Sequence, residues 1–203
     1  AKEEGRNRIT VFSPDQKMQI ELRLDWEKRI REALVNDRFT LHLQPISDIR
    51  QNKIFGYEAL LRMIDEKGQF IPPAEFLNVA ERFGLIHEID SWVVCRAIRM
   101  LREHQFDRKG LVLEVNLSGM AFKDTQLLSL IKREFATTLI NPKSLVFEIT
   151  ETAIIENMIA AQRFITSLKA IGSRFALDDF GIGFSSFNHL KHLPEKKIKI
   201  DGN

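Results

Sequence analysis

The sequence predicts an α/β fold in which the strands of a mainly parallel barrel alternate with helices. Short apolar runs typical of buried strands are separated by stretches with helical periodicity, which is the pattern of repeated β–α units. Five of these runs also carry polar groups that a hydrophobic strand would not bury without a partner. In a barrel of parallel strands such groups collect at one end. They are Glu58, Asn116, Glu148, the pair Asp178 and Asp179, and Lys199.

The first elements follow from caps and periodicity. A helix-start signal at Ser13 precedes apolar residues that recur at helical spacing as far as Leu34. Alternating apolar residues predict strands over 39–46 and 54–61. The glycine and prolines of 65–73 predict a loop that leads into the next helix.

The remaining elements alternate between helix and strand, so the sheet should be mainly parallel from the second strand onward. Six strands do not close a barrel of eight, and we expect either that two further β–α units lie beyond Asn203 or that the sequence is a fragment. The expected elements are a helix through Phe76 and Phe83 that ends at Gly84, a helix over 90–103, a strand over 111–117, a helix over 125–139, a strand over 145–150, a helix over 158–168, a strand over 175–178, a short helix over 185–193 and a strand over 197–201.

Composition excludes several classes of function. The 30 basic and 28 acidic residues give a net charge of +2, which predicts no footprint for a nucleic-acid polymer. The single cysteine, Cys95, excludes an internal disulfide and a cysteine-based zinc site. No apolar run approaches the ~20 residues of a membrane span, and no signal peptide precedes the chain. We therefore expect a cytoplasmic segment without membrane contact, whereas an inner-membrane anchor in a longer parent protein stays open.

The polar groups in the strands favour metal-dependent phosphate chemistry. Carboxylate and amide oxygens suit Mg²⁺, Mn²⁺ or Ca²⁺, and two such cations ~4 Å apart can clamp a phosphoryl group and activate water. Asp178 and Asp179 can share a site only if the strand ends between them, and the following Gly181 predicts such a break. Lys199 is suited to orienting the water or stabilising developing charge.

These residues also have structural interpretations. Taken alone, Glu58 fits an edge-strand glutamate that faces water, and Lys199 fits a strand-edge lysine in a basic run. His189 and His192 fit a solvated helix face better than a metal site. The triplet 179–181, Asp-Phe-Gly, does not indicate a protein kinase, because no His-Arg-Asp loop or Gly-rich phosphate loop precedes it.

Together the motifs are similar to those of the EAL-domain family. Glu-Ala-Leu itself is present as residues 58–60, and the other matches occur in the family's order and spacing over about residues 20–203. The matching segments are Gln44–Ile46, Gly56–Arg62, Pro73–Phe76, Ala80–Ile86, Val115–Ser118, Glu148–Glu151, Asp178–Gly181 and Lys199–Asp201.

The resemblance implies a TIM-like (β/α)8 barrel with an antiparallel first strand, which hydrolyses cyclic di-GMP to linear pGpG in bacterial signalling. It implies a two-ion site for Mg²⁺ or Mn²⁺, with Ca²⁺ inhibitory. The implied ligands of the first ion are Glu58, Asn116, Glu148 and Asp178, and Asp179 also reaches the second ion.

The resemblance implies further roles as well. Lys199 would lie near the attacking water and act in catalysis with Glu58 and Asp179, while Glu151 would brace the loop after the strand of Asp178. A homodimer is implied, and Ile182 stands where the family usually has a small or hydroxylated residue, in the loop that couples dimerisation to metal binding. The implied substrate-binding residues are Gln44, Leu60 and Arg62.

A second resemblance concerns the first residues. Residues 1–8 are similar to the tail of a GGDEF-like domain, so we expect 1–16 to be such a tail with a linker and 17–203 to be an EAL-type barrel domain. A charged leader with no preceding domain is the alternative. A further acidic ligand and a glutamine, which the family carries on its last two strands, have no counterpart here. We therefore expect the parent protein to be active and this segment alone to be weak or inactive.

Two other functions stay open. A catalytically silent domain could bind cyclic di-GMP and pass the signal to a partner, although such domains lose ligands that this chain retains. A metal-dependent lyase that uses an enolate fits the oxygen donors but not the order of the motifs.

Overall fold

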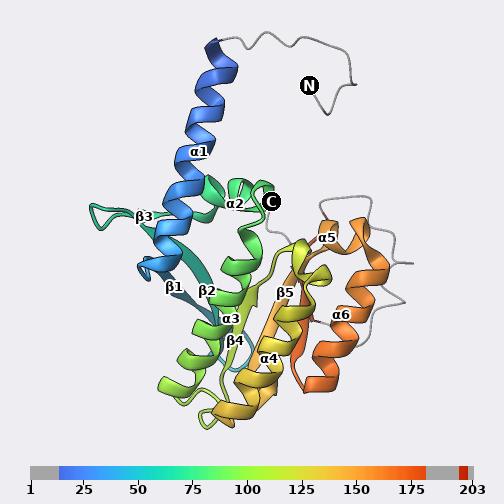
Figure 1. Ribbon diagram of the computed structural model, residues 1–203. Helices are drawn as coiled ribbons and strands as arrows, with labels where there is room; N and C mark the ends of the chain where they lie inside the picture. Colours follow the sequence, from blue (N-terminus) through green and yellow to red (C-terminus); the bar gives the residue numbers. More distant parts are fainter. Residues whose placement is uncertain (1–13, 182–196, 201–203) are drawn as a thin grey trace.

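A seven-stranded sheet organises the part of the chain that the computed structural model describes, residues 14–181 and 197–200 (Figure 1). The strand order is β1-β2-β4-β5-β6-β7, and β3 pairs with β2 outside this path. The strands from β2 to β7 along this path are parallel, whereas β1 and β3 are antiparallel to β2. The bounds are β1 (Phe39–Asp48), β2 (Lys53–Ile64), β3 (Phe70–Ile71), β4 (Val112–Asn116), β5 (Leu145–Thr150), β6 (Arg174–Phe180) and β7 (Lys197–Ile200).

The expected mainly parallel α/β arrangement is therefore confirmed, together with the antiparallel first strand. Within the described residues the sheet is not closed into a barrel. Figure 1 shows helices α3, α4 and α6 side by side in front of the sheet. The helices are α1 (Pro14–Val35), α2 (Pro73–Arg82), α3 (Ile86–Glu103), α4 (Thr125–Thr138), α5 (Glu151–Glu156) and α6 (Met158–Ile171), with 3-10 turns at Gly119–Lys123 and Pro142–Ser144.

Several elements differ from the sequence-based expectation. The loop expected over 65–73 contains β3, and two residues are too few to show a period. Helix α3 begins at Ile86, four residues before the expected start at Asp90. Helix α5 is absent from the expected elements because its six residues make less than two full turns. The helix predicted over 185–193 lies outside the described residues.

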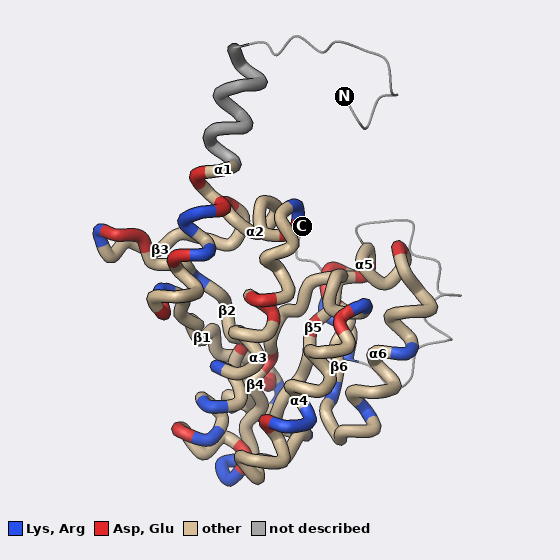
Figure 2. Tube along the Cα trace, in the orientation of Figure 1, with Lys and Arg blue, Asp and Glu red and all other residues tan. Residues whose placement is uncertain are grey.

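Basic and acidic residues are interspersed along the tube in Figure 2. Among residues 14–181 and 197–200, no helix is long and apolar enough to cross a membrane.

The two faces of the sheet have different chemistry. Successive strand residues point to opposite faces, so Leu113 and Val115 of β4 pack into the main core under the helices while Glu114 and Asn116 point to the other face. Near the start of the parallel strands, that other face carries a small apolar cluster with partly buried Phe55 against it. The cluster consists of Val112, Val146 and Ala176. Glu114 and Asn116 therefore lie on this second face, further along the strands than the small apolar cluster.

Gly56 allows strands β2 and β4 to approach closely. It is the register partner of Val112, two residues before Glu58. A Cβ atom at Gly56 would lie 2.7 Å from the backbone oxygen of Val112 and would also collide with its Cγ2. A larger residue would therefore push apart the two strands that carry Glu58 and Asn116.

A buried carboxylate connects helix α3 to the loop after β4. Asp90, only 4% exposed, accepts hydrogen bonds from the backbone N–H of Ser118 at 3.2 Å and from its hydroxyl at 2.6 Å. Burial raises the pKa of Asp90 to about 6, although both hydrogen bonds favour the ionised form; His87 lowers this pKa and Asp124 raises it. The contact fixes the loop that begins directly after Asn116.

Replacing Gly56 by alanine should lower the free energy of unfolding by about 1–3 kcal/mol, the usual cost of an overpacked contact. Urea denaturation followed by circular dichroism measures the change. Ser47→Ala, at an exposed position of β1, is the control and should stay within about 0.5 kcal/mol of the wild type. Equal stabilities for Gly56→Ala and the control would contradict the close contact.

The raised pKa of Asp90 predicts a pH-dependent stability. Between the ordinary value of 3.8 and about 6, the folded protein keeps a proton on Asp90 that the unfolded chain has lost. The free energy of unfolding therefore falls as the pH rises through this range. Asp90→Asn removes the titrating group and should flatten this fall by about 1–3 kcal/mol.

Urea titrations of wild type and Asp90→Asn at a series of pH values from ~4 to ~7 test this expectation. Contributions from other titrating groups are common to both proteins and cancel in the difference. Profiles that run parallel over the whole range would show that Asp90 keeps its ordinary pKa in the folded protein.

Candidate functional site

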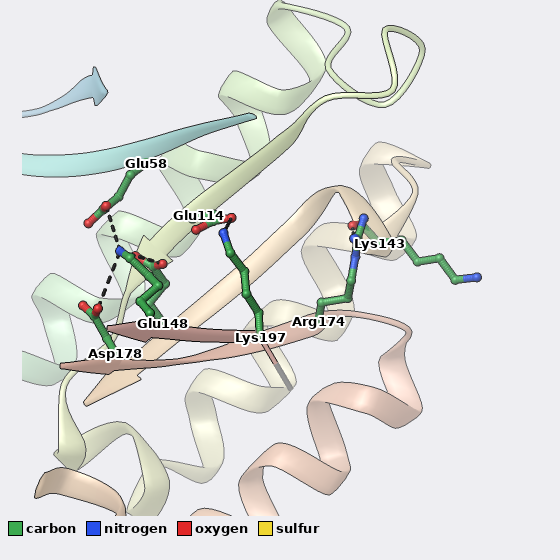
Figure 3. A network of polar contacts seen from close by, with 8 residues as sticks. Glu58, Glu114, Lys143, Glu148, Arg174, Asp178 and Lys197 are labelled. Carbon is green, nitrogen blue, oxygen red and sulfur yellow. Dashed lines mark hydrogen bonds and ion pairs between the residues drawn. The ribbon is translucent and has the colours of Figure 1, made fainter. Parts of the chain in front are cut away.

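Three carboxylates from different strands, those of Glu58, Glu148 and Asp178 in Figure 3, surround the ammonium group of Lys199 in β7. The Nζ atom of Lys199 lies 2.8 Å from Glu58 Oε2, 2.9 Å from Glu148 Oε1 and 3.7 Å from Asp178 Oδ1. Glu148 is fully buried, and the other three side chains are at most 24% exposed. Charges so poorly hydrated must stabilise one another or a bound ion.

Strand register brings these residues together. Asn116 of β4 and Glu148 of β5 are partners, and Asp178 of β6 pairs with Thr150, two positions further along β5. The Nδ2 group of Asn116 donates a hydrogen bond to Glu58 Oε1 at 3.0 Å. The predicted residues on β2, β4, β5, β6 and β7 therefore form one polar cluster on the face of the sheet away from α3, α4 and α6.

Glu58 and Lys199 form an ion pair. Burial acts to raise the pKa of Glu58, but hydrogen bonds from Lys199 and Asn116 outweigh it, and the pKa lies below its ordinary value. Burial acts to lower the pKa of Lys199, but hydrogen bonds to Glu58 and Glu148 outweigh it, and the pKa lies above its ordinary value. Both groups are therefore charged at neutral pH.

Glu148 differs electrostatically from Glu58. Burial, together with the adjoining carboxyl group of Glu114, raises the pKa of Glu148 to about 8, although Lys199 acts in the opposite direction. Its Oε2 accepts a hydrogen bond from Lys199 at 3.0 Å. Its Oε1 lies 2.9 Å from the same nitrogen but makes no hydrogen bond within the described chain, because closeness alone does not provide the required angles. The cluster thus holds more acidic oxygens than one ammonium group satisfies.

Asp178 and Asp179 are separated by a bulge and not by the end of a strand. Strand β6 continues to Phe180, so the expected end after Asp178 is wrong. The register with β7 shifts between Leu177 and Phe180, and Asp179 has a left-handed φ of 54°. The strict alternation of side chains between the two faces of the sheet is lost here. Asp178 faces the cluster, and Asp179 is exposed. Both residues nevertheless line the same cavity of about 310 Å³.

Glu151 lies beside the segment that follows β6. Its side chain is 8% exposed, and its Oε2 accepts a hydrogen bond from the backbone N–H of Gly181 at 3.2 Å. Glu151 therefore contacts the first residue after β6, where the loop begins that Glu151 is expected to brace. Ile182 and the rest of that loop, up to residue 196, lie outside the described residues.

The three residues expected to bind substrate are not equally placed. Leu60 lines the 310 Å³ cavity, whereas Gln44 and Arg62 do not. Gln44 is exposed on β1, directly opposite Glu58. Arg62 donates a hydrogen bond to the carbonyl oxygen of Leu61 at 2.7 Å. Gln44 on β1 and Arg62 on β2 thus lie outside the cavity.

Two residues of the polar network are absent from the predicted site. Glu114 Oε1 accepts a hydrogen bond from Lys197 Nζ at 2.6 Å, and Glu114 adjoins Glu148. Glu114 is a carboxylate inside an apolar strand two residues before Asn116, the same signal that identifies Glu58. Lys197 is two residues before Lys199, so the strand period places it on the same face. Both signals were therefore available in the sequence.

The donor set fits a hard divalent cation. Glu58, Glu148 and Asp178 offer carboxylate oxygens, Asn116 offers an amide oxygen, and Glu148 retains an oxygen without a hydrogen bond. Within residues 14–181 and 197–200, no three acidic, histidine or cysteine side chains are grouped so that together they could hold a metal ion. The ammonium group of Lys199 lies among these oxygens. The argument for a divalent cation therefore rests on the type of the donor atoms and not on their present arrangement.

Comparison with known proteins agrees with this geometry. Over 205 residues the chain is 33% identical to the cyclic di-GMP phosphodiesterase PdeB of Shewanella oneidensis, covering all of this chain and 24% of PdeB. Over 202 residues it is 32% identical to the bifunctional diguanylate cyclase/cyclic di-GMP phosphodiesterase MucR of Pseudomonas aeruginosa, covering 99% of this chain and 30% of MucR. The chain thus spans less than a third of the length of either relative.

A solved structure and a family model give the same assignment. The fold matches the FimX EAL domain from Pseudomonas aeruginosa bound to c-di-GMP, with a TM-score of 0.81 and 35% identity over 88% of this chain and 72% of that one. The EAL domain model matches residues 27–203, which include every strand of the sheet and all residues of the polar cluster. The chain belongs to the EAL domain family.

Proposed function

We propose that this domain hydrolyses cyclic di-GMP to linear pGpG with the help of divalent cations. The observation that carries the proposal is the cluster of Glu58, Glu148 and Asp178 around Lys199, with Asn116 bonded to Glu58. Relatives at 32–33% identity are named cyclic di-GMP phosphodiesterases, which supports the same substrate and reaction class.

In this proposal the oxygen donors hold Mg²⁺ or Mn²⁺. Glu58, Asn116, Glu148 and Asp178 would bind the first ion, and Asp179 would reach the second from beyond the bulge. Bound ions would supply Lewis-acid stabilisation of the phosphate and lower the pKa of water. The side chains of the domain would orient the water, stabilise charge on the phosphate and contact the substrate.

Lys199 would orient the attacking water and stabilise negative charge on the phosphate. Its position supports this role, because its ammonium group is already held among three carboxylates at the face of the sheet. Its raised pKa keeps it charged at neutral pH, so it would act as an electrostatic group and not as a base. Glu58, by the same reasoning, stays an ionised ligand.

Substrate contacts are proposed on both sides of the cluster. Leu60 would contact the nucleotide from the 310 Å³ cavity that Asp178 and Asp179 also line. Gln44 and Arg62 would contact it from the β1–β2 side. Glu151, bonded to the N–H of Gly181, would keep the segment after β6 in place next to the ions.

The wider setting of the domain is also a proposal. MucR combines a diguanylate cyclase with a phosphodiesterase, which supports a GGDEF-like domain before residue 17 in a longer protein. Helix α1 begins at Pro14 and continues to Val35, so this boundary would lie within a helix. We further propose a homodimer in the cytoplasm.

A cyclic di-GMP sensor without hydrolysis is the second candidate. The position of Lys199 among the carboxylates favours it, since its ammonium group already pairs with Glu58 and Glu148 without a metal ion. The similar FimX EAL domain is described as bound to c-di-GMP, and binding alone would suffice for a sensor. A Glu58→Ala variant that loses hydrolysis but still binds cyclic di-GMP would separate the two functions.

Glu58→Ala should lower the hydrolysis rate of cyclic di-GMP at least about 100-fold, because it removes a ligand and the main partner of Lys199. The variant is made in the longer natural protein, and pGpG is quantified by chromatography. Calorimetric binding of cyclic di-GMP should change less than about tenfold. Glu66→Ala, in the exposed loop after β2, is the control. Unchanged hydrolysis in Glu58→Ala would exclude the proposed site.

Removal of divalent cations by a chelator should abolish hydrolysis, and Mg²⁺ or Mn²⁺ should restore it, because the oxygen donors have no other means of activating water. Ca²⁺ should not restore it and should inhibit the Mg²⁺-loaded protein. The same chromatographic assay measures all three conditions. Hydrolysis that persists at full rate in excess chelator would contradict the metal requirement.

A further inference from the structure

The ion pair between buried Glu114 and partly exposed Lys197 lies on the same face of the sheet as the site. Lys197 Nζ is 2.6 Å from Glu114 Oε1, and the Glu114 side chain is only 1% exposed. Figure 3 shows this pair beside the group formed by Glu58, Glu148 and Asp178. A carboxylate this deeply buried is stable only with a partner, so Lys197 is held in place by a strong constraint.

The pair links strands that are not neighbours. Glu114 is on β4 and Lys197 is on β7, with β5 and β6 between them. The residue of β6 that pairs with Lys197 is Ala176, whose small side chain leaves room for the lysine to reach across the sheet. On the far side the ammonium group of Lys197 lies 5.3 Å from the centre of the Phe55 ring of β2. One side chain thus connects β7 to β4 and β2, neither of which is its neighbour in the sheet.

Backbone pairing alone leaves the middle of β7 poorly fixed. Lys197 and Ile198 pair regularly with β6, but the register then shifts, and the next pair joins Ile200 to Phe180. Lys199 lies between these two stretches, opposite the bulge at Asp179. Lys197 is two residues away on the same face, so a contact that anchors Lys197 also limits where Lys199 can point.

The pair also separates charges. Glu114 adjoins Glu148, which is itself fully buried and bonded to Lys199. If Lys197 were absent, the carboxylate of Glu114 would have Lys199 as the nearest alternative cation on β7. Lys197 therefore leaves Lys199 available to Glu58 and Glu148.

We propose that Glu114 and Lys197 are positioning residues that hold Lys199 against Glu58 and Glu148. The pair does not touch substrate in this assignment and acts through Lys199. The kinetic part of its test rests on the proposed hydrolysis of cyclic di-GMP, whereas the structural part does not.

Lys197→Met keeps the length of the side chain and removes its charge. In the longer natural protein with saturating Mg²⁺, kcat for cyclic di-GMP should fall about 10- to 100-fold while KM changes less than about threefold, because only the placement of Lys199 is affected. Lys197→Arg should recover kcat to within about fivefold of the wild type. The double variant Glu114→Gln/Lys197→Met should be less impaired than Lys197→Met, because it leaves no unpaired buried carboxylate.

Arg174→Met is the matched control. Arg174 is a cation on the same face of the neighbouring strand β6, bonded at 2.8 Å to the backbone oxygen of Lys143 and remote from Lys199. Its kcat should match that of the wild type. Thermal unfolding of every variant identifies any that are not folded, and kcat is compared only among those that are. An unchanged kcat in folded Lys197→Met would overturn the proposal.

A crystal structure of Lys197→Met without added metal provides the readout independent of activity. The Nζ atom of Lys199 should leave the position 2.9 Å from Glu148 and move toward Glu114. Retention of the Lys199 contacts with Glu58 and Glu148 would overturn the proposal. A wild-type protein that binds but does not hydrolyse cyclic di-GMP would refute the proposed function alone, and this structure would still decide the role of the pair.

Discussion

Lys199 holds carboxylates from β2, β5 and β6 around a single ammonium group, and this cluster requires those strands to keep one register. A slip of one residue in any of them would turn its carboxylate into the apolar core under the helices. Glu148 would then be buried without a partner, and the folded state would be destabilised. The site and the sheet are therefore stabilised by the same contacts, and a change in one changes the other.

Two local backbone features lie close to this cluster. Gly56 lies two residues before Glu58, where β2 and β4 are closest, and Asp179 occupies a left-handed conformation in the bulge after Asp178. Gly56 keeps its regular pairing with Val112, whereas Asp179 departs from regular strand geometry directly after Asp178. Strain of this kind persists only where surrounding contacts enforce it, here the hydrogen bond between Glu151 and Gly181 and the pairing with β7.

Relatives of this chain are named cyclic di-GMP phosphodiesterases, and the same side chains of the cluster underlie both proposed functions. The proposed enzyme would need the carboxylates to share cations with Lys199 nearby, whereas a sensor would need only a stable surface that binds the nucleotide. The adjoining pair of Glu114 and Lys197 bears on the first requirement in particular, because it concerns where Lys199 points.

The sequence by itself determined the alternating elements, the mainly parallel sheet and the identity of the polar strand residues, because period and apolar burial are local properties of the chain. It could not determine that β6 bulges at Asp179, that α3 begins at Ile86 or that Lys197 reaches Glu114 over Ala176. The bulge and the lysine contact depend on which strands become neighbours and on how far a side chain extends across them, whereas the start of α3 has no side-chain cap that would mark it in the sequence. Distances between residues that are more than 80 positions apart are decided only when the sheet has formed.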